Sequence, residues 1–192
     1  MSRGIQGGAM TPVVLLGSNG ITLPVDRESN VLVMVDIVHW RIHRGEMFTA
    51  SYITPNAAPI ADDATVAMLL ETDSTTPHLI FDVEGGGDFE AQFYEGTTTS
   101  NDGTTVTPYN MNRNSSTVQT LVTTHTPTVT DNGTQLFTHF YPGGSGGHAI
   151  GGGGFTLREW ILKASTKYLI LLTNRAGTAQ PMGVSVQWYE VA

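Results

Sequence analysis

Two histidines four positions apart have the spacing in this sequence that best suits metal chemistry. His39 and His43 follow Asp36 in the segment VLVMVDIVHWRIH, residues 31–43. On a helix, side chains at i and i+4 share a face, so the two imidazoles could hold one zinc ion. On a strand they would lie about 13 Å apart, at roughly 3.3 Å per residue, which is too far for one ion. We favour the strand because Val and Ile dominate the segment, and we interpret the histidines as polar anchors in a sheet or a subunit contact.

A second group of candidate residues is acidic and clusters around the segment 78–96. Two carboxylates about 5 to 9.5 Å apart could hydrolyse a glycoside, and carboxylates also bind calcium. We interpret the group as a solvated acidic turn, because Asp and Glu ordinarily stay exposed. The residues considered are Asp62, Asp63, Asp82, Glu84, Asp88 and Glu90.

No motif in the sequence supports catalysis. It contains no H-E-x-x-H or G-x-x-x-x-G-K pattern and no cysteine, and its one match to G-x-S-x-G is GGSGG at residues 143–147. Ser145 lies in GGSGG, but a nucleophile elbow needs a strand before the serine and a helix after it. We therefore expect a protein that is not an enzyme and that uses neither a cofactor nor a metal.

Charge and composition narrow the classes of partner. The 192 residues carry a formal net charge of −8, with Lys163 and Lys167 as the only lysines. A nucleic-acid ligand would require a basic stripe, so we expect none. The N-terminus holds an apolar stretch of about five residues, far short of the roughly twenty that cross a bilayer. We expect no membrane association and synthesis in a cytoplasm without a signal peptide.

Period-two alternation predicts strands over most of the chain. The segment HLIFDVEGGGDFEAQFYEG, residues 78–96, predicts an antiparallel hairpin that turns at its three glycines. The segments TKYLILLTN and MGVSVQWYEV predict a closing hairpin. The predicted buried faces comprise Leu79, Phe81, Val83, Phe89, Ala91, Phe93, Tyr168, Ile170, Leu172, Val184, Val186 and Trp188.

Short strands about ten residues apart indicate an all-β fold. We predict a single antiparallel β-sandwich, jelly-roll-like, over residues 31–192. Besides the helix alternative for 31–43, helix is considered for 64–71 or 157–163. An extended, Gly-rich arm is predicted for residues 1–30. Trp40, Trp160 and Trp188 are expected in the core; exposed tryptophans would instead favour carbohydrate binding.

A polar tract, EGTTTSNDGTTVTPYNMNRNSS, occupies residues 95–116. We predict that it is a long connection that leaves a strand at Tyr94 and rejoins the sheets near Val118. Connections of this length are uncommon unless they are functional or disordered. Its hydroxyls and amides could bind a protein partner.

Several segments of the chain resemble virion structural proteins of tailed bacteriophages, of the head decoration or cement type. The resemblance rests on VDIVHWRIHRGEMFTASY, FYEGTTTSNDGTTVTPYNMNRNSST, THTPTVTDNGT, GGHAIGGGG, EWILKASTKYLILLTN and VQWYE, between residues 35 and 190. It implies a non-enzymatic protein on the outer capsid surface of a virion, made in the bacterial host cytoplasm, that bridges neighbouring subunits of the major capsid protein. It also implies a homotrimer.

The arm and the polar tract supply the predicted partner contacts. An alternative is a tail or baseplate part, or a module that binds host glycans. The candidate contact residues are Arg3, Ile5, Thr97, Thr98, Asn101, Asp102, Tyr109, Asn112, Arg113 and Asn114.

Overall fold

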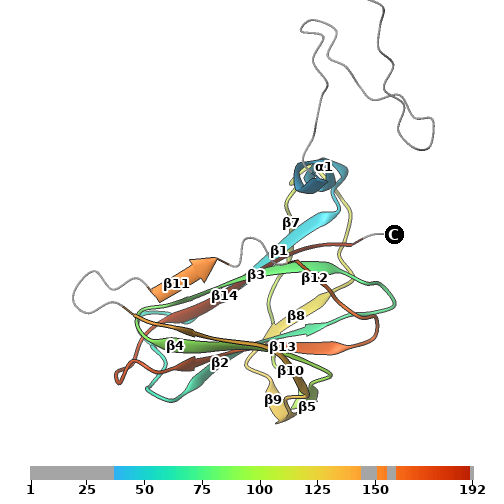
Figure 1. The fold of residues 1–192 in the computed structure, drawn as a ribbon. Coiled ribbons are helices and arrows are strands. Elements are labelled where there is room, and N and C mark those ends of the chain that lie inside the picture. Colours follow the sequence, from blue (N-terminus) through green and yellow to red (C-terminus); the bar gives the residue numbers. More distant parts are fainter. Residues whose placement is uncertain (1–36, 144–150, 155–158, 191–192) are drawn as a thin grey trace, which may run out of the picture. The chain divides into compact units, whose positions relative to one another are not determined.

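The computed structural model describes residues 37–143, 151–154 and 159–190. The compact unit that contains the strands begins at Val38. The predicted arm, residues 1–30, lies outside the described residues. In chain order the elements in Figure 1 are α1 (Ile37–Arg44), β1 (Met47–Ile53), β2 (Thr65–Glu71), β3 (His78–Gly85), β4 (Phe89–Glu95), β5 (Thr98–Asn101), β6 (Thr104–Thr105), β7 (Tyr109–Asn110), β8 (Val122–His125), β9 (Thr128–Asp131), β10 (Thr134–Tyr141), β11 (Gly151–Gly154), β12 (Trp160–Ile161), β13 (Lys167–Asn174) and β14 (Met182–Tyr189).

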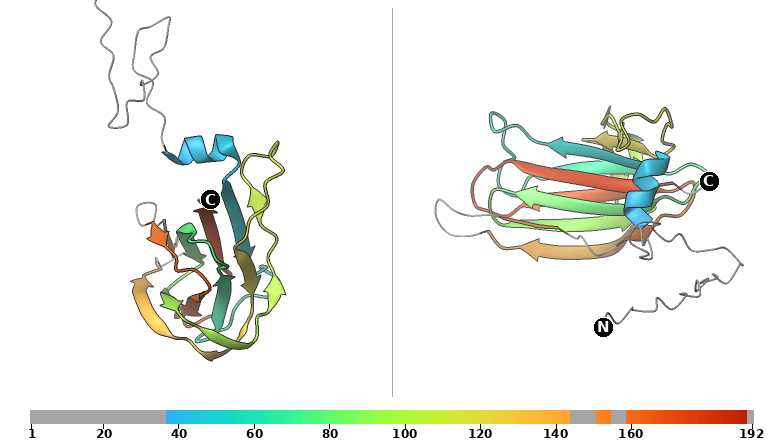
Figure 2. Two further views of the ribbon diagram at one scale, coloured as in Figure 1. Left: turned by 90° about the vertical axis from the view of Figure 1, so that its right-hand side faces the viewer. Right: turned by 90° about the horizontal axis from the view of Figure 1, so that it is seen from above.

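Two antiparallel sheets pack face to face, which confirms the predicted all-β sandwich. One sheet has the order β11-β3-β14-β1-β7, with β12 also on β3. The other has the order β10-β4-β13-β2-β8-β6, and β5 pairs with β9 as a separate ribbon. Figure 2 shows the strands of the sandwich from two further directions. No helix in the described part of the chain is long and apolar enough to span a membrane.

The core lies between the two sheets and uses the faces that alternation predicts. All twelve residues of the predicted buried faces are buried. Trp188 has no exposed surface and stacks on Phe48, with ring centroids 5.8 Å apart. Across the sandwich, Phe93 packs on Phe81 at 5.2 Å and, within its own sheet, on Tyr168 at 5.6 Å. Burying aromatic rings of this size supplies a large share of the driving force for folding.

The two predicted hairpins are wrong, because the strands of each pair belong to different sheets. Strand β3 pairs with β14, whereas β4 pairs with β13 and β10. The glycine turn after β3 therefore crosses between the layers, and β13 is likewise joined to β14 across the sandwich. A Cβ at Gly85 would lie 2.6 Å from the Phe89 ring. Glycine thus allows the chain to fold tightly over the core at this crossing.

The predicted strand over residues 31–43 is also wrong where the structure describes it, because residues 37–44 form α1. Gly45 has a φ of 72° and its N–H bonds to the carbonyl of Ile42, while the Glu46 N–H bonds to Arg41. This pair of bonds is a Schellman motif, which ends a helix. Strong helix-ending geometry at Gly45 therefore outweighs the β propensity of Val and Ile.

The two segments considered as helices, 64–71 and 157–163, and one tryptophan prediction also need correction. Residues 65–71 form strand β2, and the segment 157–163 contains β12 in its described part. Trp188 is in the core and Trp160 packs against it, as expected. Trp40 lies on α1 and keeps 40% of its surface exposed, so its assignment to the core is wrong.

Candidate partner-contact surface

The polar tract is built into the fold, which corrects the prediction of a long connection between sheets. It carries β5, β6 and β7, which pair with β9, β8 and β1 respectively. Threonine suits this role because its branched side chain fits a strand and its hydroxyl satisfies backbone groups. The tract is therefore a surface layer fastened at three places to other strands.

The polar side chains in the first part of the tract form hydrogen bonds within the protein. Thr97 is buried, and its hydroxyl donates to the Asn132 carbonyl at 2.8 Å. The hydroxyls of Thr98 and Thr130 are 2.8 Å apart, and Asn101 accepts a hydrogen bond from the Gly103 N–H. Thr97 is therefore inaccessible as a contact residue, whereas Thr98 and Asn101 are exposed.

An ion-pair cluster anchors this part of the tract to β13. The Nζ of Lys167 lies 2.6 Å from Oδ1 of Asp102, 3.2 Å from the Thr99 hydroxyl and 3.8 Å from Oε2 of Glu71. The hydrogen bond from Lys167, reinforced by one from Thr99, holds the pKa of Asp102 below its ordinary value. Asp102 is therefore an anionic anchor that already has its counter-ion.

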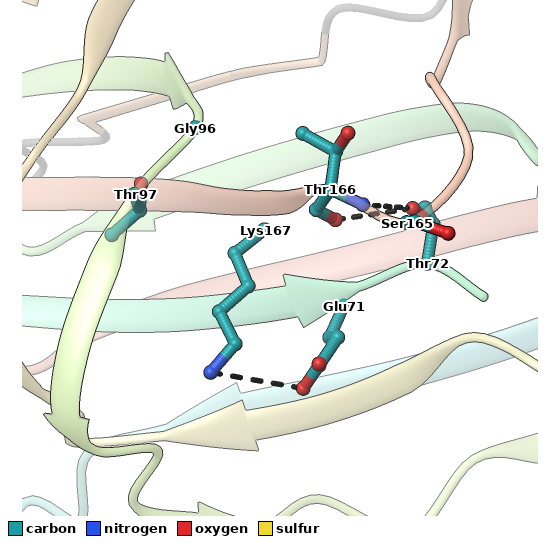
Figure 3. Close-up of a pocket in the computed structure, with 7 residues that line it drawn as sticks. All are labelled: Glu71, Thr72, Gly96, Thr97, Ser165, Thr166 and Lys167. Atoms are coloured by element: carbon teal, nitrogen blue, oxygen red, sulfur yellow. Dashed lines mark hydrogen bonds and ion pairs between the residues drawn. The ribbon is translucent and has the colours of Figure 1, made fainter.

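A surface cavity of about 520 Å³ opens beside this cluster. Figure 3 shows Lys167 directed toward Glu71, and Thr72 bonded to the backbone N–H and C=O of Thr166 at 2.9 and 3.1 Å. These polar groups satisfy one another, and they do not form a nucleophile with an adjacent base. The cavity is lined by Glu71, Thr72, Gly96, Thr97, Ser165, Thr166 and Lys167.

The second part of the tract and the two residues that follow it form an exposed loop, which we define as residues 109–118. Tyr109 is 54% exposed, and the Arg113 guanidinium carbon lies 5.2 Å from its ring centroid. Val118, at the other end of the loop, is 72% exposed. The Asn114 side chain is exposed, and its backbone N–H donates to Asn112 Oδ1 at 3.1 Å. The loop thus presents an aromatic ring, an arginine and an apolar side chain together with amides.

Two asparagines fasten the 109–118 loop to the end of α1. The Asn110 side chain donates to the carbonyls of Gly45 at 2.8 Å and Thr117 at 3.2 Å. The Asn112 side chain donates to the His43 carbonyl at 3.1 Å. The loop is therefore held in one shape by its own fold, which lowers the entropy lost when a partner binds.

The predicted contact residues therefore fall into two groups. Figure 1 shows β7 at the end of the sandwich where α1 lies, and the β5–β9 ribbon at the opposite end. Arg3 and Ile5 lie outside the described residues. The first group comprises Thr97, Thr98, Asn101 and Asp102, and the second comprises Tyr109, Asn112, Arg113 and Asn114.

Glu190 is a structural anchor that sequence reasoning missed. Its carboxylate accepts hydrogen bonds from the backbone N–H groups of Thr120 at 2.9 Å and Leu121 at 3.0 Å. It also accepts one from the Trp188 indole at 3.0 Å. Thr120 and Leu121 lie 70 and 69 residues from Glu190 in the chain, so no local pattern could have identified these two contacts.

A second missed cluster joins His78, Glu159 and Tyr189. The Tyr189 hydroxyl lies 2.5 Å from Glu159 Oε1 and 2.8 Å from His78 Nδ1. Burial, with the neighbouring Glu159, raises the pKa of Tyr189 to about 12. Partial burial opposes ionisation of Glu159, but hydrogen bonds from Tyr189 and His78 lower its pKa overall. The cluster joins the ends of β3, β12 and β14.

The acidic residues of the sequence analysis are mostly engaged within the protein. Arg175 lies 2.5 Å from Asp63 and 3.3 Å from Glu90, and Asp88 accepts the Gly143 N–H. No group of three or more His, Cys, Asp or Glu residues in the described ranges is arranged to hold a metal ion. Ser145 lies outside those ranges.

No protein-family model matches the chain, and comparisons with curated proteins and with solved structures found no relative.

Proposed function

We propose that this protein is a non-enzymatic capsid decoration protein. It binds the outer surface of a bacteriophage capsid as a homotrimer and bridges neighbouring subunits of the major capsid protein. The sequence resemblance to cement proteins supports the proposal, and so does the β-sandwich fold, which offers a rigid body between capsid subunits. The main structural support for the proposal is the exposed pair of Tyr109 and Arg113 on a loop that is hydrogen-bonded to the sandwich.

The composition of the 109–118 loop suits a protein interface. Tyrosine and arginine are enriched among the residues that dominate binding energy between proteins. Tyr109 and Val118 leave apolar surface in water, and a partner that covers it gains roughly 25 cal/mol for each Å². The surrounding amides and hydroxyls provide the polar rim that such interfaces carry. Identical contacts repeated around a shell then reinforce one another.

Reconstitution of particles that lack the protein tests the proposal. Adding the wild-type chain should raise the temperature at which heated particles release their genome. The Tyr109→Ala variant should weaken binding to particles by about tenfold or more. Phe140→Ala is a matched control, because Phe140 is also an aromatic residue with about half of its surface exposed, on β10 outside the loop. It should bind and stabilise like the wild type.

Two results would count against the proposal. The first is an unchanged release temperature after the wild-type chain is added. The second is equal binding of the Tyr109→Ala and Phe140→Ala variants, which would place the contact outside the loop.

A module that binds host glycans, on the tail or baseplate, is the second candidate function. The exposed indole of Trp40 favours it, because sugars stack on exposed aromatic rings. The guanidinium groups of Arg41 and Arg44 lie 5.1 and 4.7 Å from that ring centroid and compete for it. Glycan-array binding that is lost in Trp40→Ala would support this function over capsid decoration.

A further inference from the structure

We infer that His39 and His43 form a two-imidazole chelate for a divalent transition-metal ion such as Cu²⁺, Ni²⁺ or Zn²⁺. The two side chains lie one turn apart on α1, and both are exposed to solvent. The strand expected from the sequence would have separated them too far for one ion. The observed helix reverses that conclusion. The inference goes beyond the proposed function and holds whatever partner the protein binds.

The geometry of the pair fits a metal ion. The Nε2 atoms of His39 and His43 are 3.0 Å apart, with ring centroids 4.5 Å apart and planes inclined at 66°. Two metal–nitrogen bonds of about 2.0 to 2.1 Å, meeting at about 90 to 110°, place their nitrogens about 2.8 to 3.4 Å apart. The two nitrogens therefore already have the separation that adjacent positions in a coordination shell require. The histidine whose Nε2 carries the hydrogen takes the other tautomer on binding, with its proton on Nδ1, so that both Nε2 lone pairs are available to the ion.

The surroundings of the pair select the class of ion. Arg41 and Arg44 on the same helix bring two positive charges, and Glu46, which contacts both, brings one negative charge. This excess of positive charge opposes every divalent cation, and the pair offers nitrogen ligands rather than the oxygen ligands that Mg²⁺ and Ca²⁺ require. Ions that prefer imidazole gain enough from the two Nε2 atoms to bind here, in the order Cu²⁺ above Ni²⁺ and Zn²⁺.

The position of His43 at the C-terminal end of α1 also favours a bound cation electrostatically. His43 lies in the last turn of α1, at the partly negative end of the helix dipole. Asn112 donates to the His43 carbonyl and holds this end in place. The chelate therefore lies at a helix end that another segment of the chain supports.

Calorimetric titration of the full chain with Ni²⁺, in a buffer that does not chelate metals, tests the inference. We expect one equivalent of Ni²⁺ to bind to the wild type. The His39→Gln and His43→Gln variants each leave one imidazole and should weaken that binding by about 10²-fold. Glutamine keeps good helix propensity at these exposed positions, so both variants should retain the fold, which their circular dichroism checks.

A control histidine separates the chelate from general imidazole binding. His125 stacks on Tyr52, with ring centroids 3.8 Å apart, and lies on β8. His125→Gln should bind Ni²⁺ like the wild type. With Cu²⁺, electron paramagnetic resonance should detect two coordinated nitrogens in the wild type and one in His43→Gln. Absence of stoichiometric binding to the wild type, or equal binding by the His39, His43 and His125 variants, would overturn the inference.

Discussion

The ammonium group of Lys167 at the start of β13 lies 2.6 Å from Oδ1 of Asp102, just beyond β5. This contact fastens the polar tract to the sandwich. Both side chains are partly exposed, so solvent screens the pair. We predict that Asp102→Asn lowers the free energy of unfolding by about 0.5 to 1 kcal/mol at neutral pH, measured by urea denaturation.

The effect of Asp102 depends on pH because the folded protein lowers the pKa of this carboxyl. A depressed pKa adds stability above the unfolded value, about 3.9, and that stability is lost as the pH falls through the folded value. The difference between wild type and Asp102→Asn should therefore shrink in acid. It should also shrink in a Lys167→Met background, where the hydrogen bond from Thr99 remains. A difference that is the same with and without Lys167 would contradict the assigned contact.

Gly103 and Gly96 provide a matched test of how the tract is packed. Both have positive φ, 90° and 77°, so alanine is strained at either position. A Cβ at Gly103 would lie 2.2 Å from the His125 carbonyl oxygen, whereas a Cβ at Gly96 would meet no atom within 4 Å. We predict that Gly96→Ala costs about 1 kcal/mol of stability. Gly103→Ala should cost about 1 to 3 kcal/mol more, because the backbone must move.

Thermal and urea denaturation of the two alanine variants measure this difference. Equal losses of stability would mean that the turn at Gly103 does not pack against β8, and the placement of the tract would then be wrong.

Which residues are buried could be predicted from the sequence, but which strands pair could not. The alternation in β3 and β4 identifies Phe81 and Phe93 as core residues whichever sheet holds them. A glycine turn between two such strands serves a hairpin or a crossing between layers equally well. The choice depends on partners such as β13 and β14, which lie far away in the sequence. Pairing is therefore a tertiary property that a local pattern does not contain.

For α1, the sequence did contain a usable signal. Gly45 follows a turn with Arg41, His43 and Arg44, and a basic last turn before glycine is typical of a helix end. The Val and Ile content of the preceding residues favoured a strand and concealed this signal.

The candidate surface shows the same division. Tyr109 and Arg113 were predicted as contacts from composition, but their stacking and their attachment through Asn110 required the fold.

Glu190 should be more important for stability than its place near the end of β14 suggests. Replacing it with alanine removes the acceptor for the N–H groups of Thr120, Leu121 and Trp188. We predict a loss of about 1 to 3 kcal/mol for Glu190→Ala, because these donors lose their partner. Glu190→Gln keeps one carbonyl oxygen and should lose less. Urea denaturation followed by tryptophan fluorescence measures both, and equal stability of the Ala variant and the wild type would contradict this role.

Tyr168 links stability to alkaline pH. Burial raises its pKa to about 12, and its hydroxyl donates to Glu95 and accepts the Lys163 N–H. The unfolded chain loses this proton near pH 10 and the folded chain near pH 12. The stability is therefore complete below pH 10 and falls, by up to about 1.4 kcal/mol per pH unit for this group, as the pH rises toward 12.

The Tyr168→Phe variant removes this proton and should show a shallower decline between pH 10 and 12, although it is less stable at neutral pH. Urea denaturation across this range measures the slope. An unchanged slope would show that Tyr168 ionises normally in the folded protein.

An electron-microscopy reconstruction of the phage particle that contains this chain tests the central proposal most directly. We predict density for the β-sandwich on the outer capsid surface, at positions of threefold symmetry, with the loop that carries Tyr109 and Arg113 against a major capsid protein subunit. Density for this chain on the tail or baseplate, or its absence from the particle, would contradict the proposal.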